Sequence, residues 1–251
     1  MGDRISIVLP DLLKFCPTKP ATNVHYEAVR SASIASVRSF HLFSEERQAK
    51  FEANLFEYFM SIAHPNAGED SLRLCVDDAV LFYVNDTMTD YQELGDAGLT
   101  CDTLVDAFSS PHNHDGSNYA RYVADFSLRY SRAARPRSHE RFASHFKAYS
   151  SAVFHEVKHR EAELILDAEA FVAHRRVNSA CMACFDMVEL DLEMDLPHEV
   201  YASPEFRIPY MAAVDLVWLG NDICSYRLEE GLSHGSHNVI SVYMKTFNFN
   251  I

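Results

Sequence analysis

Long stretches of this sequence place apolar residues three and four positions apart and fill the positions between them with polar residues. That spacing gathers the apolar side chains on one face of an α-helix, so it predicts an amphipathic helix wherever it continues over several turns. The segments with this spacing are 27–40, 44–64, 71–90, 117–134, 138–165, 166–176 and 209–230. No long stretch alternates between apolar and polar residues, and the pattern therefore predicts an all-α protein.

Proline, glycine and one polar loop interrupt the chain between these segments. The breakers are Pro17, Pro20, Pro65, Gly68, the loop 109–118, Pro136, Pro197 and Pro204. We find no internal repeat and no low-complexity linker that would separate two domains. Residues 1–251 are therefore expected to form a single domain, built as a bundle of helices around one core.

Composition narrows the class of protein. A chain of 251 residues with 48% hydrophobic residues can fill one large core. The formal net charge of -14 argues against a nucleic-acid partner, because phosphate backbones attract basic surfaces. No window approaches the roughly 18 to 20 consecutive apolar residues of a membrane span, and the first residues lack the features of a secretory signal. The sequence predicts a soluble, cytoplasmic protein.

A set of polar residues interrupts the last apolar segment, in the stretch WLGNDICSYRLEEG at 218–231. Asn221, Ser225 and Glu229 stand four residues apart, so a helix would place their oxygen atoms on one face. Mg²⁺ prefers oxygen ligands and usually completes its shell with substrate phosphates and water. The spacing predicts a magnesium site that in turn holds a phosphate group.

A second polar group ends the apolar run LFYVNDTMTD at 81–90. Asp86 and Asp90 lie one helical turn apart, and two carboxylates on one stripe repel each other unless a cation lies between them. Two interpretations are open for this pair. Either the helix emerges into solvent here, or the two carboxylates share a metal site.

These motifs together resemble those of class I terpene synthases, and in particular the sesquiterpene synthases of basidiomycete fungi. NDICSYRLE at 221–229 fits the pattern (N/D)Dxx(S/T)xxxE, and DTMTD at 86–90 stands in the place of the aspartate-rich motif. HRRVNSACMACF at 174–185 is similar to an RR-x-T-S-G-x-x-x-x-F segment, and VLPDLLKFCPTKPATNVHYEAV at 8–29 is similar to an opening LPDLL…P…N-P-H. The resemblance covers nearly the whole chain in the right order, which is far more specific than any one motif.

The resemblance implies a class I terpenoid synthase α-helical bundle that binds three Mg²⁺ ions and an isoprenyl diphosphate. Its metal ligands would be Asp86 and Asp90 on one wall and Asn221, Ser225 and Glu229 on the other. Mg²⁺ acts as a Lewis acid that neutralises the leaving diphosphate, which leaves an allylic carbocation behind. The implied reaction is the ionisation and cyclisation of farnesyl diphosphate to a sesquiterpene.

Further roles follow from the same resemblance. Arg176 would sense the diphosphate, and Ser179 and Ala180 would match the linker and effector positions. The effector acts through its backbone carbonyl, so alanine suits this position if its backbone dihedral angles are ordinary.

Two aromatic residues could line the cavity that holds the cation. Phe82 precedes Asp86 by one turn and would point into the same cavity, and Trp218 precedes Asn221 by three residues. Aromatic ring faces stabilise positive charge. Ordinary core packing is the alternative for both residues.

The sequence also departs from the family pattern. Thr87 follows Asp86 where the family usually has an acidic residue, and Asn85 stands where the family often has an aromatic or aliphatic one. The family continues with further helices that carry an Arg-Tyr pair, so the chain is expected to lack the last helices of the bundle. Apolar faces would then be exposed unless another chain covers them, as in a homodimer. The alternative function is a catalytically impaired or inactive homologue that binds diphosphate.

Two rival motifs remain. His155, Glu156 and His159 form a formal HExxH, which on a helix can bind zinc in a metalloprotease. The charged pair that follows it is atypical of a zinc helix in a cleft, and 13 histidines make a chance match common. Cys181 and Cys184 form a CxxC without a second pair nearby, which favours buried thiols over zinc ligands.

Overall fold

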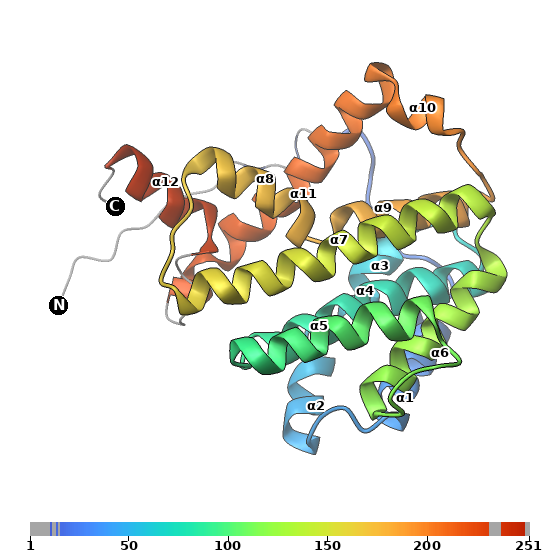
Figure 1. Cartoon of the computed structure of the whole chain (residues 1–251). Helices are drawn as coiled ribbons and strands as arrows, with labels where there is room; N and C mark the ends of the chain where they lie inside the picture. The colour runs from blue at the N-terminus through green and yellow to red at the C-terminus, as the bar shows by residue number, and fades with distance from the viewer. Residues whose placement is uncertain (1–10, 12–13, 15, 231–236, 249–251) are drawn as a thin grey trace.

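The computed structural model describes residues 11, 14, 16–230 and 237–248. All the regular elements of these residues are α-helices, which confirms the all-α prediction (Figure 1). The LPDLL stretch at 9–13 lies mostly outside the described residues. The helices are α1 (Tyr26–Ser39), α2 (Glu45–Glu52), α3 (Phe56–Ala63), α4 (Glu69–Thr89), α5 (Leu94–Ser109), α6 (Asn118–Ala133), α7 (Pro136–Glu161), α8 (Ala168–Asn178), α9 (Cys181–Asp191), α10 (His198–Ala202), α11 (Pro204–Glu230) and α12 (Val239–Phe247).

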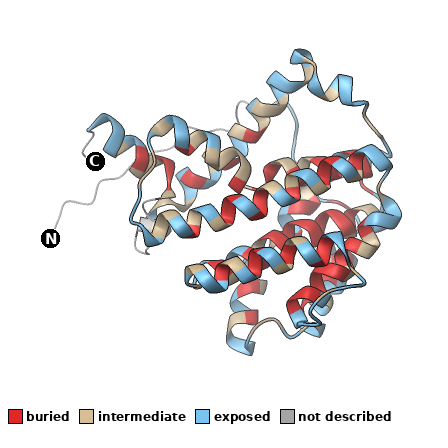
Figure 2. Ribbon diagram, in the orientation of Figure 1, coloured by how far each residue is buried: buried red, intermediate tan, exposed pale blue. Residues whose placement is uncertain are grey.

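Helix α4 forms the centre of the larger hydrophobic core. From Leu72 to Asn85 it is buried on almost every side, and it contacts α1, α3, α5, α6, α7 and α9. A helix that is apolar around its whole circumference has no solvent face to offer, so its neighbours must enclose it. Figure 2 shows the buried positions concentrated on α4 and the helices packed around it. Exposed side chains are found on α4 only at its two ends, at Glu69 and Asp70 in the first turn and at Asp86 in the last.

A second hydrophobic cluster joins α8, α9, α11 and α12. Its buried members are Phe171, Cys181, Val214, Trp218, Val239 and Val242. Trp218 is 2% exposed, its ring meets Phe171 edge to face, and its indole N–H donates to Asp215 at 2.9 Å. In Figure 1, α8, α11 and α12 lie together on the side of the molecule away from α1, α2 and α6. The two polar groups noted in the sequence thus belong to helices of different clusters, α4 and α11.

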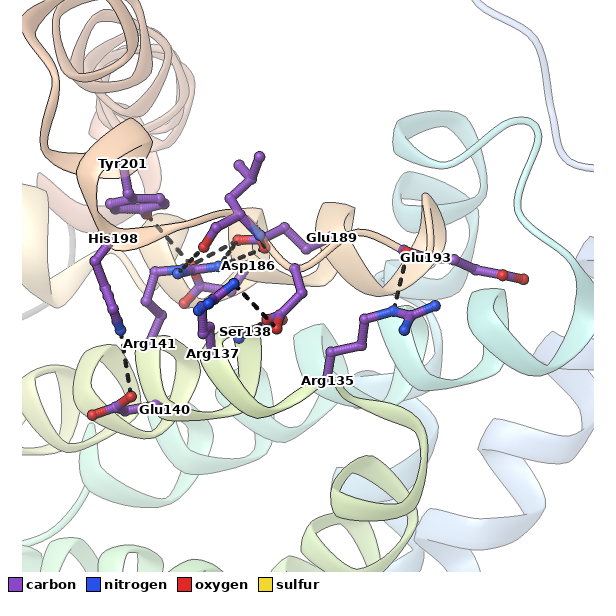
Figure 3. A network of polar contacts seen from close by, with 12 residues as sticks. Arg135, Arg137, Ser138, Glu140, Arg141, Asp186, Glu189, Glu193, His198 and Tyr201 are labelled. Atoms are coloured by element: carbon purple, nitrogen blue, oxygen red, sulfur yellow. Dashed lines mark hydrogen bonds and ion pairs between the residues drawn. The ribbon is translucent and has the colours of Figure 1, made fainter.

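A buried ion pair fixes α7 to α9 (Figure 3). Arg141 donates from Nε and Nη2 to Glu189 Oε1 at 3.1 and 2.6 Å, and both side chains are 7% exposed. Arg141 Nη1 also donates to the carbonyl of Leu196 at 2.9 Å, while the Leu196 N–H donates to Glu189 Oε2 at 2.8 Å. The pair therefore satisfies its own hydrogen-bonding groups and holds the segment between α9 and α10 in place.

The helices differ from the sequence prediction in several places, and α5, α9, α10 and α12 all lie outside the predicted segments. The single helix expected over 44–64 is wrong, because Leu55 adopts φ 55° in the left-handed region and separates α2 from α3. Helix α5 was not predicted, since Gly95 and Gly98 obscure the helical pattern of its first turns. Gly98 has a packing reason: a Cβ there would lie 3.2 Å from the Phe154 ring of α7.

Within the described part of the chain, no helix combines the length and the apolar character that a membrane crossing requires. Several large apolar side chains are nevertheless exposed on α11, among them Ile208 and Leu216, which are 70% and 75% exposed. Ile208 lines a surface pocket together with Arg176 of α8.

Candidate active site

The last turn of α4 presents two carboxylates. Asp86 is exposed, and its Oδ1 accepts a hydrogen bond from the hydroxyl of Tyr149 on α7 at 2.7 Å. Asp90 caps the C-terminus of α4 and is also exposed. The helix therefore places both predicted residues one turn apart, at the point where α4 leaves the core.

The Asp86 carboxyl lies in an unfavourable electrostatic environment. Solvent reaches the group, but the surrounding helices displace much of its hydration, and this loss together with the charges of Asp90 and Glu156 raises its pKa to about 7. The hydrogen bond from Tyr149 and the charge of Arg175 act in the opposite direction. A cation bound at this position would relieve the excess negative charge.

This raised pKa predicts a pH-dependent stability of the metal-free protein. A carboxyl whose folded-state pKa exceeds its unfolded value contributes stability below about pH 4, and that contribution is lost as the pH rises through about 7. We expect D86N to be more stable than the original chain at about pH 8 and to lose this advantage progressively as the pH falls towards about 4. Urea unfolding in the presence of a chelator measures the difference. D102N, which removes an exposed carboxylate from α5, serves as the matched control, and an equal effect of both variants would contradict the prediction.

Arg175 on α8 bridges to the start of the second polar group. Its Nε donates to Asp222 Oδ1 at 2.9 Å, its Nη2 to Asn221 Oδ1 at 3.0 Å and its Nη1 to Asn178 Oδ1 at 2.8 Å. Burial alone would lower the pKa of Arg175, but the carboxylates of Asp222, Glu156 and Asp86 raise it. The charge of Asp86 on α4 thus acts on the same guanidinium that holds α11. Arg175 therefore contacts α11 directly and is attracted to Asp86 of α4 over a longer range.

The three predicted oxygen ligands stand one turn apart on the continuous helix α11. Besides its bond from Arg175, Asn221 accepts on its backbone carbonyl the hydroxyl of Ser225 at 2.8 Å. Glu229 Oε2 accepts the side-chain amide of Asn238 at 3.0 Å, and this buried amide also donates to the Asp222 carbonyl at 2.7 Å. An amide oxygen, a hydroxyl and a carboxylate form a hard donor set that fits Mg²⁺. The Ser225 hydroxyl would have to turn away from the backbone to join it.

Arg176 does not lie beside these residues. It forms a two-fold ion pair with Asp215, with Nε and Nη2 each 2.7 Å from a carboxylate oxygen. Successive residues on a helix point about 100° apart, so only one of two adjacent arginines can face Asn221. The structure brings Arg175 to that position, whereas the resemblance indicated Arg176 of the same Arg-Arg pair.

Ser179 and Ala180 form the break between α8 and α9. Ser179 caps α8, and its Oγ accepts the N–H of Cys181 at 3.4 Å. Ala180 adopts φ 58° and ψ 0°, so the condition under which alanine would suit this position, an ordinary backbone conformation, is not met. The Ala180 carbonyl accepts the N–H of Cys184 at 3.1 Å and begins the hydrogen bonding of α9.

Because an L-residue is strained in the left-handed region, A180G is expected to stabilise the fold. The free energy released by relief of the strain exceeds the cost of the extra conformational entropy that glycine gives to the unfolded chain. The free energy of unfolding in urea should therefore rise by about 0.5 to 1 kcal/mol. A183G is the matched control, since Ala183 lies within α9 and glycine there should cost about 1 kcal/mol. A loss of stability in A180G similar to that in A183G would contradict the prediction.

Phe82 and Trp218 both belong to the core in this structure. Phe82 is 5% exposed, and its ring lies 4.7 Å from that of Tyr149 and 5.7 Å from that of Phe146, measured between ring centres. Core packing, the alternative given for both aromatics, is therefore the role seen here. Phe82 acts on Asp86 only indirectly, because it packs against Tyr149, whose hydroxyl donates to Asp86.

The rival zinc motif does not converge on a metal site. His155 is exposed, whereas Glu156 turns inward, accepts the side-chain amide of Asn178 and lies 3.8 Å from His174 Nε2. Over residues 16–230 and 237–248, no group of three or more His, Cys, Asp or Glu side chains is arranged to hold a metal ion. Cys181 and Cys184 are free thiols, and Cys181 is buried, which agrees with the packing interpretation.

Comparison with known proteins bears on the family of this chain. Residues 79–251 match the family described as terpene synthase family 2, C-terminal metal binding. The bifunctional terpene synthase Agr4 of Cyclocybe aegerita is 35% identical over 237 residues, which cover 94% of this chain and 69% of Agr4. The Delta(6)-protoilludene synthase of Stereum hirsutum is 31% identical over 251 residues, covering 98% of this chain and 67% of that protein. A Coprinopsis cinerea protein, 36% identical over 237 residues and also matched over 94% and 69%, carries the name linoleate 10R-lipoxygenase COP4.

Solved structures share the same fold at lower identity. The linalool/nerolidol synthase of Streptomyces clavuligerus superposes with a TM-score of 0.83 at 17% identity, over 92% of this chain and 78% of that one. The germacradien-4-ol synthase of Streptomyces citricolor gives a TM-score of 0.80 at 19% identity, over 93% and 76%. From the matched family and from relatives above 30% identity over most of the chain, we conclude that this chain belongs to the terpene synthase family and has the all-α terpenoid synthase fold.

Proposed function

We propose that this chain catalyses the Mg²⁺-dependent ionisation and cyclisation of farnesyl diphosphate to a sesquiterpene, with release of diphosphate. The observation that carries the proposal is Arg175, which holds Asn221 and Asp222 of α11 and interacts electrostatically with Asp86 of α4. A cationic side chain that contacts the oxygen-rich part of α11 and is attracted to Asp86 of α4 suits a polyanionic group bridged by metal ions.

Each polar residue has a role in this proposal. Asp86 and Asp90 would hold metal ions on one wall, and Asn221, Ser225 and Glu229 would hold one on the other, for the three Mg²⁺ ions expected. Mg²⁺, when bound, supplies the Lewis acidity that neutralises the leaving diphosphate. Protons compete with metal for the Asp86 carboxylate, so its affinity for Mg²⁺ should fall as the pH drops below about 7.

Arg175 takes the diphosphate contact that the sequence assigned to Arg176. Its planar guanidinium presents several donors in a fixed fork, which matches phosphate oxygens well. On binding substrate it would exchange its hydrogen bond to Asn221 for one to the diphosphate, and this exchange would free the Asn221 oxygen for metal. Ser179 and Ala180 follow Arg175 at the break of α8 and would connect diphosphate binding to the position of α9.

The direct test is incubation of purified protein with farnesyl diphosphate and Mg²⁺, followed by gas chromatography with mass spectrometry. We expect cyclic sesquiterpenes that disappear when a chelator is added, with less product from geranyl and geranylgeranyl diphosphate. D86N serves as the inactive control. If no product forms although Mg²⁺ and diphosphate still bind, the proposed reaction is wrong and the chain is a diphosphate-binding homologue without catalysis.

A further inference from the structure

A buried chain of hydrogen bonds ends on Asp86. The hydroxyl of Tyr119 donates to Asn85 Oδ1 at 2.8 Å, the amide of Asn85 donates to the Tyr149 hydroxyl at 3.2 Å, and that hydroxyl donates to Asp86 Oδ1 at 2.7 Å. Tyr119, Asn85 and Tyr149 are 6%, 0% and 1% exposed. They come from α6, α4 and α7, so three core helices contribute to the position of one exposed carboxylate.

The donors and acceptors of these groups allow only one orientation of the hydrogen bonds in which Asp86 receives one. A tyrosine hydroxyl has a single hydrogen, so Tyr149 can donate to Asp86 only if Asn85 presents its NH₂ group to Tyr149. Asn85 does so when its oxygen faces Tyr119, which has a hydrogen to give. The reversed amide would take the hydrogen of Tyr149 and leave Asp86 without a donor. Tyr119 therefore sets the orientation of Asn85, and Asn85 sets that of Tyr149.

The ring of Tyr149 is itself held firmly. It packs edge to face on Phe82 within the core, and α7 carries it on a helix of 26 residues. The polar atoms of Asn85 would be costly in this apolar environment if they were unpaired, but both of them have partners here. The polar residue that departs from the family pattern at position 85 thus has a defined structural task.

We propose that Tyr149 is a positioning residue that fixes the carboxylate of Asp86 for metal binding, with Asn85 and Tyr119 acting through it. The inference rests on the proposed function, in which Asp86 is a metal ligand. Thr87 follows Asp86, so the next residue in the sequence supplies no second carboxylate and the orientation of Asp86 matters more. Tyr149 engages Oδ1 and leaves Oδ2 for the metal. A ligand ordered before the metal arrives binds it more tightly than one that must be ordered on binding.

The experiment compares Y149F with the original chain, since phenylalanine keeps the ring and its packing. Thermal unfolding is followed against Mg²⁺ concentration with inorganic diphosphate present, and the Mg²⁺ requirement of the reaction is measured alongside. We expect Y149F to need about tenfold more Mg²⁺ for half-maximal stabilisation, the factor that loss of a hydrogen bond to a charged group produces. Y201F is the matched control, because its hydroxyl also contacts a buried aspartate, Asp186, and it should leave the Mg²⁺ requirement unchanged.

A second comparison tests whether Tyr119 acts on Asp86 through Tyr149. Y119F should raise the Mg²⁺ requirement by a smaller factor and should add nothing in the Y149F background, because it acts through Tyr149. Equal Mg²⁺ requirements for Y149F and the original chain, or independent effects of Y119F and Y149F, would overturn the inference. If the original chain shows no Mg²⁺-dependent stabilisation with diphosphate, the proposed function fails and this inference fails with it.

Discussion

Replacement of Arg175 by lysine is expected to lower kcat/KM for farnesyl diphosphate by about two to three orders of magnitude, as loss of one donor to a developing anion does. The guanidinium donates to Asp222, Asn221 and Asn178 at once, and a single ammonium cannot reproduce that fork. Lysine retains the positive charge beside buried Asp222, so R175K should still fold. Quantification of product under steady-state conditions measures the loss, and thermal unfolding verifies the fold.

R176K provides the matched control, because the two arginines are neighbours on α8. Arg176 pairs with Asp215 at a partly exposed site, where an ion pair is worth about 0 to 1 kcal/mol. We expect its kcat/KM to stay within about threefold of the original value. The reverse result, with R176K impaired and R175K active, would return the diphosphate contact to the residue that the sequence resemblance indicated.

The second large effect is expected for stability. R141M should lower the free energy of unfolding by about 3 to 5 kcal/mol, because it leaves the buried carboxylate of Glu189 without its partner (Figure 3). The carbonyl of Leu196 loses its donor at the same time. Urea unfolding at neutral pH measures the change.

Two further variants test whether the loss of stability in R141M comes from the burial of the unpaired charge. R38M breaks the ion pair with Glu52, which has similar two-fold geometry at 2.7 and 3.0 Å but lies at an exposed arginine, and it should cost far less stability than R141M. The double variant R141M/E189M removes both buried charges and should recover much of the loss in R141M. Similar losses in R141M and R38M would show that burial of the first pair has little energetic effect.

The helical architecture could be predicted where apolar spacing is strong. The segment expected at 71–90 corresponds to α4, and the one expected at 209–230 lies within α11. The break at Leu55 could not be predicted, because neither proline nor glycine marks it. Helix α5 was missed because its glycines permit close packing against α7, which is a tertiary contact that periodicity does not record.

The candidate site, too, could be predicted only in part from the sequence. One-turn spacing was sufficient to group Asn221, Ser225 and Glu229, since a continuous helix fixes their relation. Spacing alone could not choose between Arg175 and Arg176, because that choice depends on which way α8 faces its neighbours. The contact between Tyr149 and Asp86 joins residues 63 positions apart and leaves no local trace in the sequence.

The position of Trp218 gives the molecule a built-in optical reporter. It is the only tryptophan of the sequence, and it is enclosed where α8 meets α11, with its indole N–H on Asp215. Selective excitation of tryptophan would therefore report fluorescence changes where α8 meets α11, with no contribution from residues around α4. Loosening of the helix that carries Arg175 would register as a red shift in emission, separately from global denaturation followed by circular dichroism.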